Sequence, residues 1–221
     1  GGSAVVGAYQ ITTGLNTYVS AVGWGAAPWG NGTFGSSAAL AVSEQLRLYS
    51  QDNFGEDLVF NVRNGGIYYW DQSSGLSTRG VNITSLGGAS DCPTAAAQVL
   101  VSDNDQHIIA FGANTLGSAT QDPLLVRWSD QESAADWTPT ATNTSGGVRV
   151  NSGSFIVGAV QTRQEILIWT DTSLNSMRFV GAPFVFQFTT LSADVSMISP
   201  NAAVNARGNV FFMDKTGFYV Y

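Results

Sequence analysis

The fold class is decided by the stretch Leu58-Val-Phe-Asn-Val62, Arg63-Asn64-Gly65-Gly66, Ile67-Tyr-Tyr-Trp70. Two short runs rich in β-branched and aromatic residues flank a polar turn, a pattern that predicts an antiparallel hairpin. Asn-Gly between such runs favours a type I′ turn. We therefore expect β-structure in this part of the chain.

The same pattern recurs three more times along the sequence. Position Val59 of the first hairpin is followed by matching positions after intervals of 49, 58 and 44 residues, close to the roughly 40–50 residues of a four-stranded propeller blade. The matching positions are Ile108, Ile166 and Val210. The other three hairpins are His107–Phe111 with Leu124–Trp128, Glu165–Trp169 with Leu174–Phe179, and Asn209–Met213 with Phe218–Tyr221.

Further strand candidates lie between the hairpins, so each repeat has enough strand for a small antiparallel sheet. These candidates are Gln45–Tyr49, Gln98–Val101, Ser154–Val157 and Val185–Phe188. A small sheet is marginally stable alone and gains stability by stacking on its neighbours. Short helical turns are expected only at Thr94–Ala97 and Ser133–Asp136. The sequence therefore predicts an all-β, antiparallel, propeller-like domain of about four hairpin-based blades over residues 36–221.

Residues 1–35 differ from the rest, since glycines separate the large rings of Trp24, Trp29 and Phe34. Such a glycine content disfavours a helix or a long strand. We expect an irregular arm whose rings either pack on their own domain or form a surface for a neighbouring chain. The chain starts without Met and ends inside a strand pattern, so we expect it to be part of a longer polypeptide.

Composition and charge limit the possible functions. Hydrophobic residues make up 44% of the chain, enough to build a core. Nine basic against 16 acidic residues give a net charge of −7, which disfavours a surface that binds nucleic acid by neutralising phosphates. No apolar run approaches the roughly 18 residues of a membrane span. Cys92 is the only cysteine, which excludes an internal disulfide and a cysteine-based zinc site.

Residues that support catalysis or cofactor binding are scarce. His107 is the only histidine and opens a strand, and no G-x-S-x-G nucleophile motif is present. The glycines lack the Lys-Ser/Thr that follows a phosphate loop. Acidic clusters at Asp52–Asp57 and Asp103–Asp105 offer oxygen atoms suited to calcium, but neither follows the EF-hand order. We predict no enzyme, no cofactor and no metal site.

A set of ordered segments resembles one family. The segments are Leu125–Glu132, Asp136–Pro139, Thr162–Asp171, Phe179–Phe184, Asn209–Met213 and Gly217–Tyr221, preceded by the glycine- and tryptophan-rich arm from Gly23 to Gly30. Together they resemble the tail nozzle, or tail tubular protein B, of short-tailed podovirus-type bacteriophages, and more loosely the packaged-DNA stabilisation proteins. The resemblance runs from about Gly23 to Tyr221 and is densest after Asp122.

The resemblance implies a structural subunit located in the virion. Such a subunit contains a β-propeller and assembles as a ring, typically sixfold, below the portal and adaptor. The ring forms the distal channel for genome exit, and it contacts the tail adaptor or tube protein and the fibres while DNA passes without specific binding. Nozzle proteins are much longer than 221 residues, so this chain would be one part of a subunit.

Two groups of residues are candidates for roles in the wall of such a channel. Trp128, Trp137 and Trp169 are expected to pack between strands or blades, or to contact another subunit. Arg127 and Arg163 are expected to pair with Asp130 or Asp171. The full structural or interface set is Trp24, Trp29, Trp70, Arg127, Trp128, Asp130, Trp137, Arg163 and Trp169. An acidic lumen, which would repel phosphates over a Debye length of about 8 Å, is assigned to Glu56, Asp57, Asp103 and Asp105.

Two other functions remain open from the sequence. A glycan-binding or glycan-cleaving propeller would need a pocket where carboxylates and Trp or Tyr rings converge, and any chain with 16 acidic residues contains candidate pairs. An intracellular scaffold of the WD40 kind is disfavoured, because Gly-His and regularly spaced Trp-Asp dipeptides are missing.

Overall fold

The computed structural model describes residues 48–103 and 105–221, and these form an all-β fold with almost no helix. The chain divides into Gly1–Leu48 and Tyr49–Tyr221, and every described strand belongs to the second unit. Trp24, Trp29 and the expected arm 1–35 lie outside the described residues, so the boundary at residue 35 stays a prediction. None of the helices in the described part is long or apolar enough to cross a membrane.

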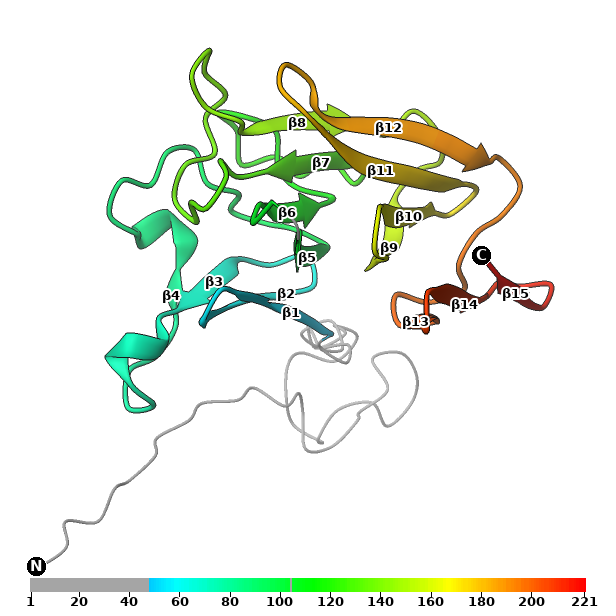
Figure 1. Ribbon diagram of the computed structural model, residues 1–221, viewed down its shortest axis with the longest axis horizontal. Coiled ribbons are helices and arrows are strands. Elements are labelled where there is room, and N and C mark those ends of the chain that lie inside the picture. The colour runs from blue at the N-terminus through cyan, green and yellow to red at the C-terminus, as the bar shows by residue number, and fades with distance from the viewer. Residues whose placement is uncertain (1–47, 104) are drawn as a thin grey trace, which may run out of the picture. The chain divides into compact units, whose positions relative to one another are not determined.

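The described strands form four antiparallel sheets, numbered here in chain order (Figure 1). Sheet 1 contains β1 (Tyr49–Phe54), β2 (Asp57–Val62), β3 (Ile67–Trp70) and β4 (Val81–Asn82). Sheet 2 contains β5 (Gln98–Val101), β6 (Ile108–Phe111), β7 (Leu125–Trp128) and β8 (Gly146–Arg149). Sheet 3 contains β9 (Ile156–Gln161), β10 (Ile166–Thr170), β11 (Leu174–Gly181) and β12 (Val185–Ser192). Sheet 4 contains β13 (Ala203–Ala206), β14 (Asn209–Met213) and β15 (Phe218–Val220).

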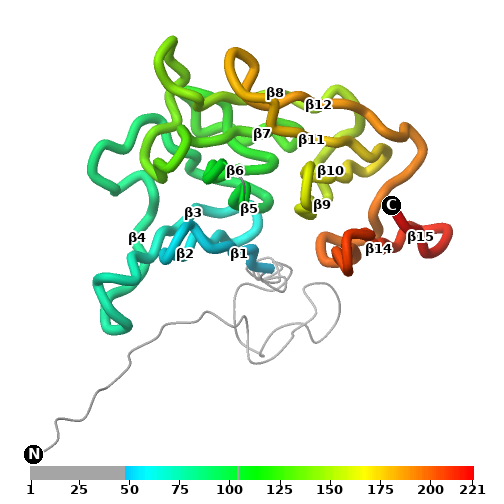
Figure 2. The backbone as a smooth tube through the Cα atoms, viewed as in Figure 1, coloured from blue at the N-terminus to red at the C-terminus, as the bar shows by residue number. Residues whose placement is uncertain are grey.

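Each sheet is a meander in which consecutive strands pair, as the backbone trace shows (Figure 2). The four expected hairpins are confirmed as the pairs β2–β3, β6–β7, β10–β11 and β14–β15. The four matching positions of the repeat all lie in the second strand of their sheet, and all are buried. Each sequence repeat therefore corresponds to one sheet.

Local details differ from the sequence predictions. The only helices in the described residues are two 3-10 turns, η1 (Gln72–Ser74) and η2 (Ile83–Ser85), so the expected turns at Thr94–Ala97 and Ser133–Asp136 are wrong. Asn64 has a φ of 59°, whereas Gly65 does not have a positive φ. A type I′ turn needs positive φ at both central residues, so that prediction was also wrong.

The core consists of three apolar seams, each between consecutive sheets. The seam between sheets 1 and 2 includes Val59 and Ile67 on one side and Ile108 and Ala110 on the other, with Trp137 among them. Side chains of a strand point alternately to its two faces. The other residues of β6, Ile109 and Phe111, therefore join the second seam, with sheet 3.

Strand β10 repeats this arrangement one sheet later. Ile166 and Ile168 belong to the seam with sheet 2. Leu167 and Trp169 belong to the seam with sheet 4, where the Trp169 ring lies 5.3 Å from that of Phe212. Strands β6 and β10 are buried along their whole length because both of their faces are covered.

Polar contacts also join neighbouring sheets. The Gln98 side chain donates to the carbonyl of Ala159 and accepts from its N–H, both at 2.8 Å, so it substitutes for a backbone partner between sheets 2 and 3. Tyr221 donates to Glu165 Oε1 at 2.7 Å between sheets 4 and 3. The Gln98 bonds satisfy backbone groups of the buried Ala159, which burial would otherwise leave unpaired.

We expect Trp169→Ala to destabilise the protein by roughly 3–5 kcal/mol, because it leaves a large cavity in the third seam. Trp169 is fully buried, and its Nε1 has no hydrogen-bond partner among the described residues. Trp169→Phe should therefore cost much less, since it keeps a ring and removes an unsatisfied donor. Urea unfolding measures both, with the exposed Phe184→Ala as control. Equal losses for the two Trp169 variants would contradict this account.

Candidate functional site

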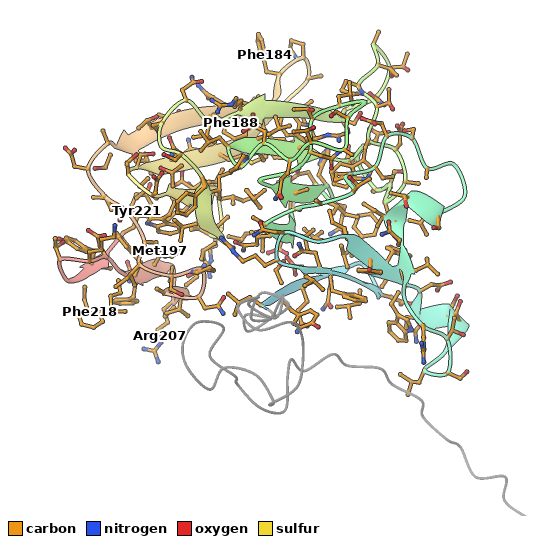
Figure 3. The ribbon with its side chains drawn as sticks, turned by 180° about the vertical axis from the view of Figure 1, so that it is seen from behind. Phe184, Phe188, Met197, Arg207, Phe218 and Tyr221 are labelled. Carbon is orange, nitrogen blue, oxygen red and sulfur yellow. The ribbon has the colours of Figure 1, made fainter. Side chains whose placement is uncertain are left out.

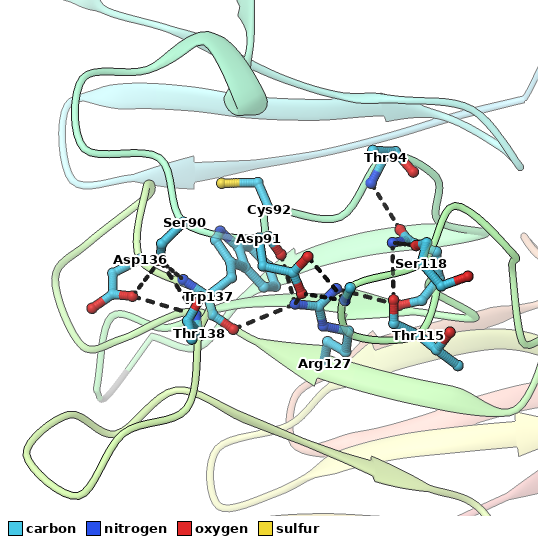
Figure 4. A network of polar contacts seen from close by, with 12 residues as sticks. Ser90, Asp91, Cys92, Thr94, Thr115, Ser118, Arg127, Asp136, Trp137 and Thr138 are labelled. Atoms are coloured by element: carbon cyan, nitrogen blue, oxygen red, sulfur yellow. Dashed lines mark hydrogen bonds and ion pairs between the residues drawn. The ribbon is translucent and has the colours of Figure 1, made fainter.

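A buried polar network lies where three loops meet the face of sheet 2 that is turned towards sheet 1 (Figure 4). Its centre is Arg127 in β7, whose side chain is only 3% exposed. Val126 and Trp128 on either side of it point to the opposite face and join the seam with sheet 3. Strand alternation therefore places a single charged group among apolar neighbours.

The Arg127 guanidinium is held by groups from all three loops. Nη2 lies 3.0 Å from Asp91 Oδ2 and donates to the Asp91 carbonyl at 2.6 Å. It also donates to the Trp137 carbonyl at 3.3 Å, and Nη1 donates to the Asn114 carbonyl at 3.3 Å. Burial lowers the pKa of Arg127, and the Asp91 carboxylate opposes that shift. The guanidinium therefore joins the three loops inside the protein.

The residues around Arg127 form further hydrogen bonds. Asp91 accepts from the Gly117 N–H at 3.0 Å, and its φ of 44° is tolerated because aspartate readily adopts left-handed backbone conformations. Asn114 Oδ1 accepts from Thr94 N at 2.8 Å, and its Nδ2 donates to the Ser118 carbonyl at 2.6 Å. The network therefore joins the three loops through hydrogen bonds.

Cys92 lies beside this network, and its side chain is buried. Burial raises the pKa of its thiol to about 11, so the thiol stays protonated at neutral pH. Its Sγ donates to the Ala135 carbonyl at 3.2 Å. The residue acts as a small buried group that contacts the loop of Trp137.

A second buried network surrounds His107, which is fully buried. Its Nδ1 lies 2.8 Å from Asp105 Oδ2, and its Nε2 lies 2.9 Å from Thr144 Oγ1. Thr144 in turn donates to Asp130 Oδ1 at 2.6 Å, and Ser102 donates to Asp105. Because both ring nitrogens are engaged and no solvent reaches the ring, this histidine connects loops of sheet 2.

An open depression lies beside the β1–β2 turn. Its lining combines the rings of Phe54 and Tyr69 with four carboxylates, and no basic residue is among its lining residues. Burial and a hydrogen bond to the Asp57 carboxylate raise the pKa of Tyr69. The four carboxylates are Glu56, Asp57, Asp71 and Glu132. No three His, Cys, Asp or Glu residues in the described part gather as a metal site.

The structure places the candidate tryptophans at different depths. Trp137 and Trp169 are fully buried in the first and third seams, and Trp128 is buried in the second. The Trp128 ring packs edge-on against Phe186 at 5.1 Å, which the sequence analysis did not anticipate. A Cβ at Gly146 would lie 2.6 Å from that ring, so glycine is required there. Trp70 is half-buried and donates to the Thr78 carbonyl.

The ion pairs expected for Arg127 differ from those in the structure. Arg127 pairs with Asp91 and not with Asp130 or Asp171. Asp130 instead accepts from the backbone N–H of Thr144 at 2.7 Å, and Asp171 accepts from that of Ser154 at 2.6 Å. Arg163 is exposed in the turn between β9 and β10, and its role stays a prediction.

The proposed acidic lumen set does not form one surface. Asp105 is only 3% exposed and is used by His107 and Ser102, so its assignment to a lumen was wrong. The sequence signal, an acidic residue in a loop, does not separate a buried acceptor from a solvated charge. Glu56 and Asp57 line the depression, and Asp103 is exposed.

Comparisons with known proteins add little to this geometry. No family model matches the sequence, and no curated protein matches it. A similar solved structure is described as the crystal structure of Kluyvelomyces marxianus Hsv2, at 7% identity and a TM-score of 0.43, covering 78% of this chain and 44% of that one. The chain thus spans less than half of that protein's length, and the similarity is too slight to support a conclusion.

We expect Arg127→Met to destabilise the protein by about 3–5 kcal/mol, because it leaves buried carbonyls and the Asp91 carboxylate without their partner. The matched control is Arg149→Met on the neighbouring strand, which breaks an exposed ion pair with Asp122 and should cost at most about 1 kcal/mol. Chemical denaturation measures both. A similar small loss of stability for the two substitutions would show that the buried network does not hold the three loops in place.

Glu165 should make stability depend on pH. Burial raises the pKa of its carboxyl, but hydrogen bonds from Ser176 and Tyr221 and the charge of Arg178 outweigh burial, so the pKa lies below 4.5. A lowered pKa stabilises the folded state above the pKa of the unfolded state, and this contribution is lost as pH falls through the folded value. We expect thermal melts of Glu165→Gln to lose less stability below about pH 4.5 than the parent. If the melting temperatures of the parent and of Glu165→Gln fall in parallel as pH is lowered, this assignment is contradicted.

Proposed function

We propose that this chain is a structural component of a short-tailed phage tail, where it forms part of the ring-shaped nozzle channel for genome ejection. We further propose that its four sheets are blades of a propeller-like domain within a longer subunit. On this proposal the protein is not an enzyme, and its partners are further copies in a sixfold ring, the tail adaptor or tube protein, and the fibres. The observation that carries the proposal is the series of stacked sheets, whose loops are joined by the buried polar networks of Arg127 and His107.

Stacked sheets suit a wall that must keep its shape. Three apolar seams join four sheets in chain order. The charged groups of Arg127 and Asp105 are used inside the protein, between loops. Interiors packed in this way have low compressibility and transmit strain, which is what a tube under pressure from a moving genome requires.

The charge of the chain also supports the proposal. A net charge of −7 and a depression lined by four carboxylates produce a surface that repels phosphates. A channel for DNA must not bind its cargo tightly, and weak repulsion over about a Debye length meets that need.

The same depression favours a second candidate, a glycan-binding or glycan-cleaving propeller. The rings of Phe54 and Tyr69 lie beside the carboxylates of Glu56 and Asp57. Sugar sites commonly combine ring faces with hydrogen-bonding carboxylates, and glycoside hydrolysis uses two carboxyl groups. The two candidates make different predictions for the same purified protein.

The deciding experiment is electron microscopy of the purified chain, alone and with a candidate tail adaptor, together with a gel-shift assay on duplex DNA. We expect hollow symmetric rings and no retention of DNA at physiological salt, because the surface is acidic. Isolated particles whose melting temperature rises with oligosaccharides, and whose shift is lost in Tyr69→Ala, would instead support the glycan candidate. Tight DNA binding would contradict both.

A further inference from the structure

The contacts of His107 determine how many hydrogens its ring carries. The side chain is fully buried, and each ring nitrogen lies within hydrogen-bond distance of one oxygen. Nδ1 is 2.8 Å from Asp105 Oδ2, and Nε2 is 2.9 Å from Thr144 Oγ1. A neutral imidazole has a single N–H, so it can donate at only one of these contacts. The hydrogen at the other contact must come either from the oxygen or from a second ring N–H.

The Thr144 hydroxyl cannot supply it, because its one hydrogen is used elsewhere. Thr144 Oγ1 lies 2.6 Å from Asp130 Oδ1, and an ionised carboxylate only accepts hydrogen bonds, so the hydroxyl hydrogen points to Asp130. The hydroxyl oxygen has two lone pairs, and one of them accepts from the N–H of Gln131 at 3.0 Å. The other lone pair faces the ring, so Nε2 is the donor in this contact.

The Asp105 carboxylate is an acceptor as well. Its Oδ1 accepts from the Ser102 hydroxyl, and its Oδ2 faces Nδ1 of the ring. Imidazole is ordinarily a far stronger base than a carboxylate, so the proton between Oδ2 and Nδ1 belongs to the ring. Both nitrogens of His107 are then donors, which makes the ring an imidazolium.

The charges around this site are those that a buried cation needs. A buried charge is tolerated when it is paired and hydrogen-bonded. Asp105 contacts the ring directly from the loop between β5 and β6, and Asp130 contacts it through Thr144. On the side of sheet 3, Glu165 lines a small cavity together with Asp105. The charged groups that face the ring from these three elements are therefore all carboxylates.

Two phenylalanines of sheet 3 pack against the His107 ring. They belong to the β11–β12 hairpin, whose turn carries the exposed Phe184 at the margin of the fold (Figure 3). The ring centroids of Phe179 and Phe186 lie 5.8 Å and 5.3 Å from that of His107. Because the ring has no exposed surface, water cannot replace a contact that the ring loses.

From these contacts we propose that His107 is an imidazolium in the folded protein, and that its Nε2–H holds the loop of residues 129–145 between β7 and β8. When the ring loses this hydrogen, Nε2 and Thr144 Oγ1 become two acceptors that face one another in a buried site. Such a contact is unfavourable, so Thr144 must leave either the ring or Asp130. The loop is therefore held while the ring is protonated and is released as pH rises. This inference does not rest on the proposed function.

The first test is nuclear magnetic resonance of the whole nitrogen-15-labelled chain. His107 is the only histidine of the 221 residues, so the ring signals need no assignment. We expect both ring nitrogens to be protonated in the folded protein at neutral pH, and one of them to lose its hydrogen as pH is raised. A neutral ring in the folded protein at neutral pH would overturn the proposal. If that neutral ring carried its hydrogen on Nε2, the missing proton would lie on Asp105.

The second test compares Thr144→Val with Thr144→Ser. Valine keeps the shape of threonine but removes the acceptor of Nε2, so the ring should become neutral at a lower pH than in the parent. Serine keeps the hydroxyl and should restore the titration of the parent, a readout that a change in packing alone would not move. We also expect thermal melts of the parent to lose more stability than those of Thr144→Val as pH rises from weakly acidic to weakly alkaline.

A His107 ring that titrates at the same pH in the parent and in both variants would overturn the role of Thr144. If Thr144→Val does not fold, the ring signals of the parent and of Thr144→Ser still decide the question. Both should then show an imidazolium at neutral pH, and a neutral ring in the folded parent refutes the proposal.

Discussion

The structure depends on strands whose side chains serve two apolar seams at once. In β6, Ile108 contacts sheet 1 while Ile109 contacts sheet 3, and in β10 Ile166 and Leu167 divide in the same way. A strand covered on both faces has no solvated side, which is why these strands read as continuous apolar runs. The low charged content of the chain, 11%, follows from the same constraint.

Sheets that stack in this way leave their loops to be held by polar groups. The Arg127 network joins three loops at the first seam, and the Asp105–His107–Thr144 network joins two more. Hydrogen-bonded buried networks of this kind rigidify the structure around them. Residue types that often signal chemistry, a lone histidine and a lone cysteine, are thereby explained as structural groups.

Short apolar and aromatic runs on either side of polar turns are local features that could be read from the sequence, and they located the four hairpins and the second strand of each sheet. Partners of charged residues could not be read in this way. Asp91 lies 36 residues before Arg127, and only the fold brings them to 3.0 Å. Likewise, Asp103 and Asp105 look equivalent in the sequence, yet one is exposed and the other accepts from Ser102 in the interior.

The two ends of the series of sheets are not held equally. The first seam has an ion pair with four guanidinium contacts. The third seam instead leaves Trp169 Nε1 without a partner among the described residues and relies on the Glu165–Tyr221 bond, which acid weakens. Local opening follows the weakest contacts, so sheet 4 should be the first of the described sheets to separate.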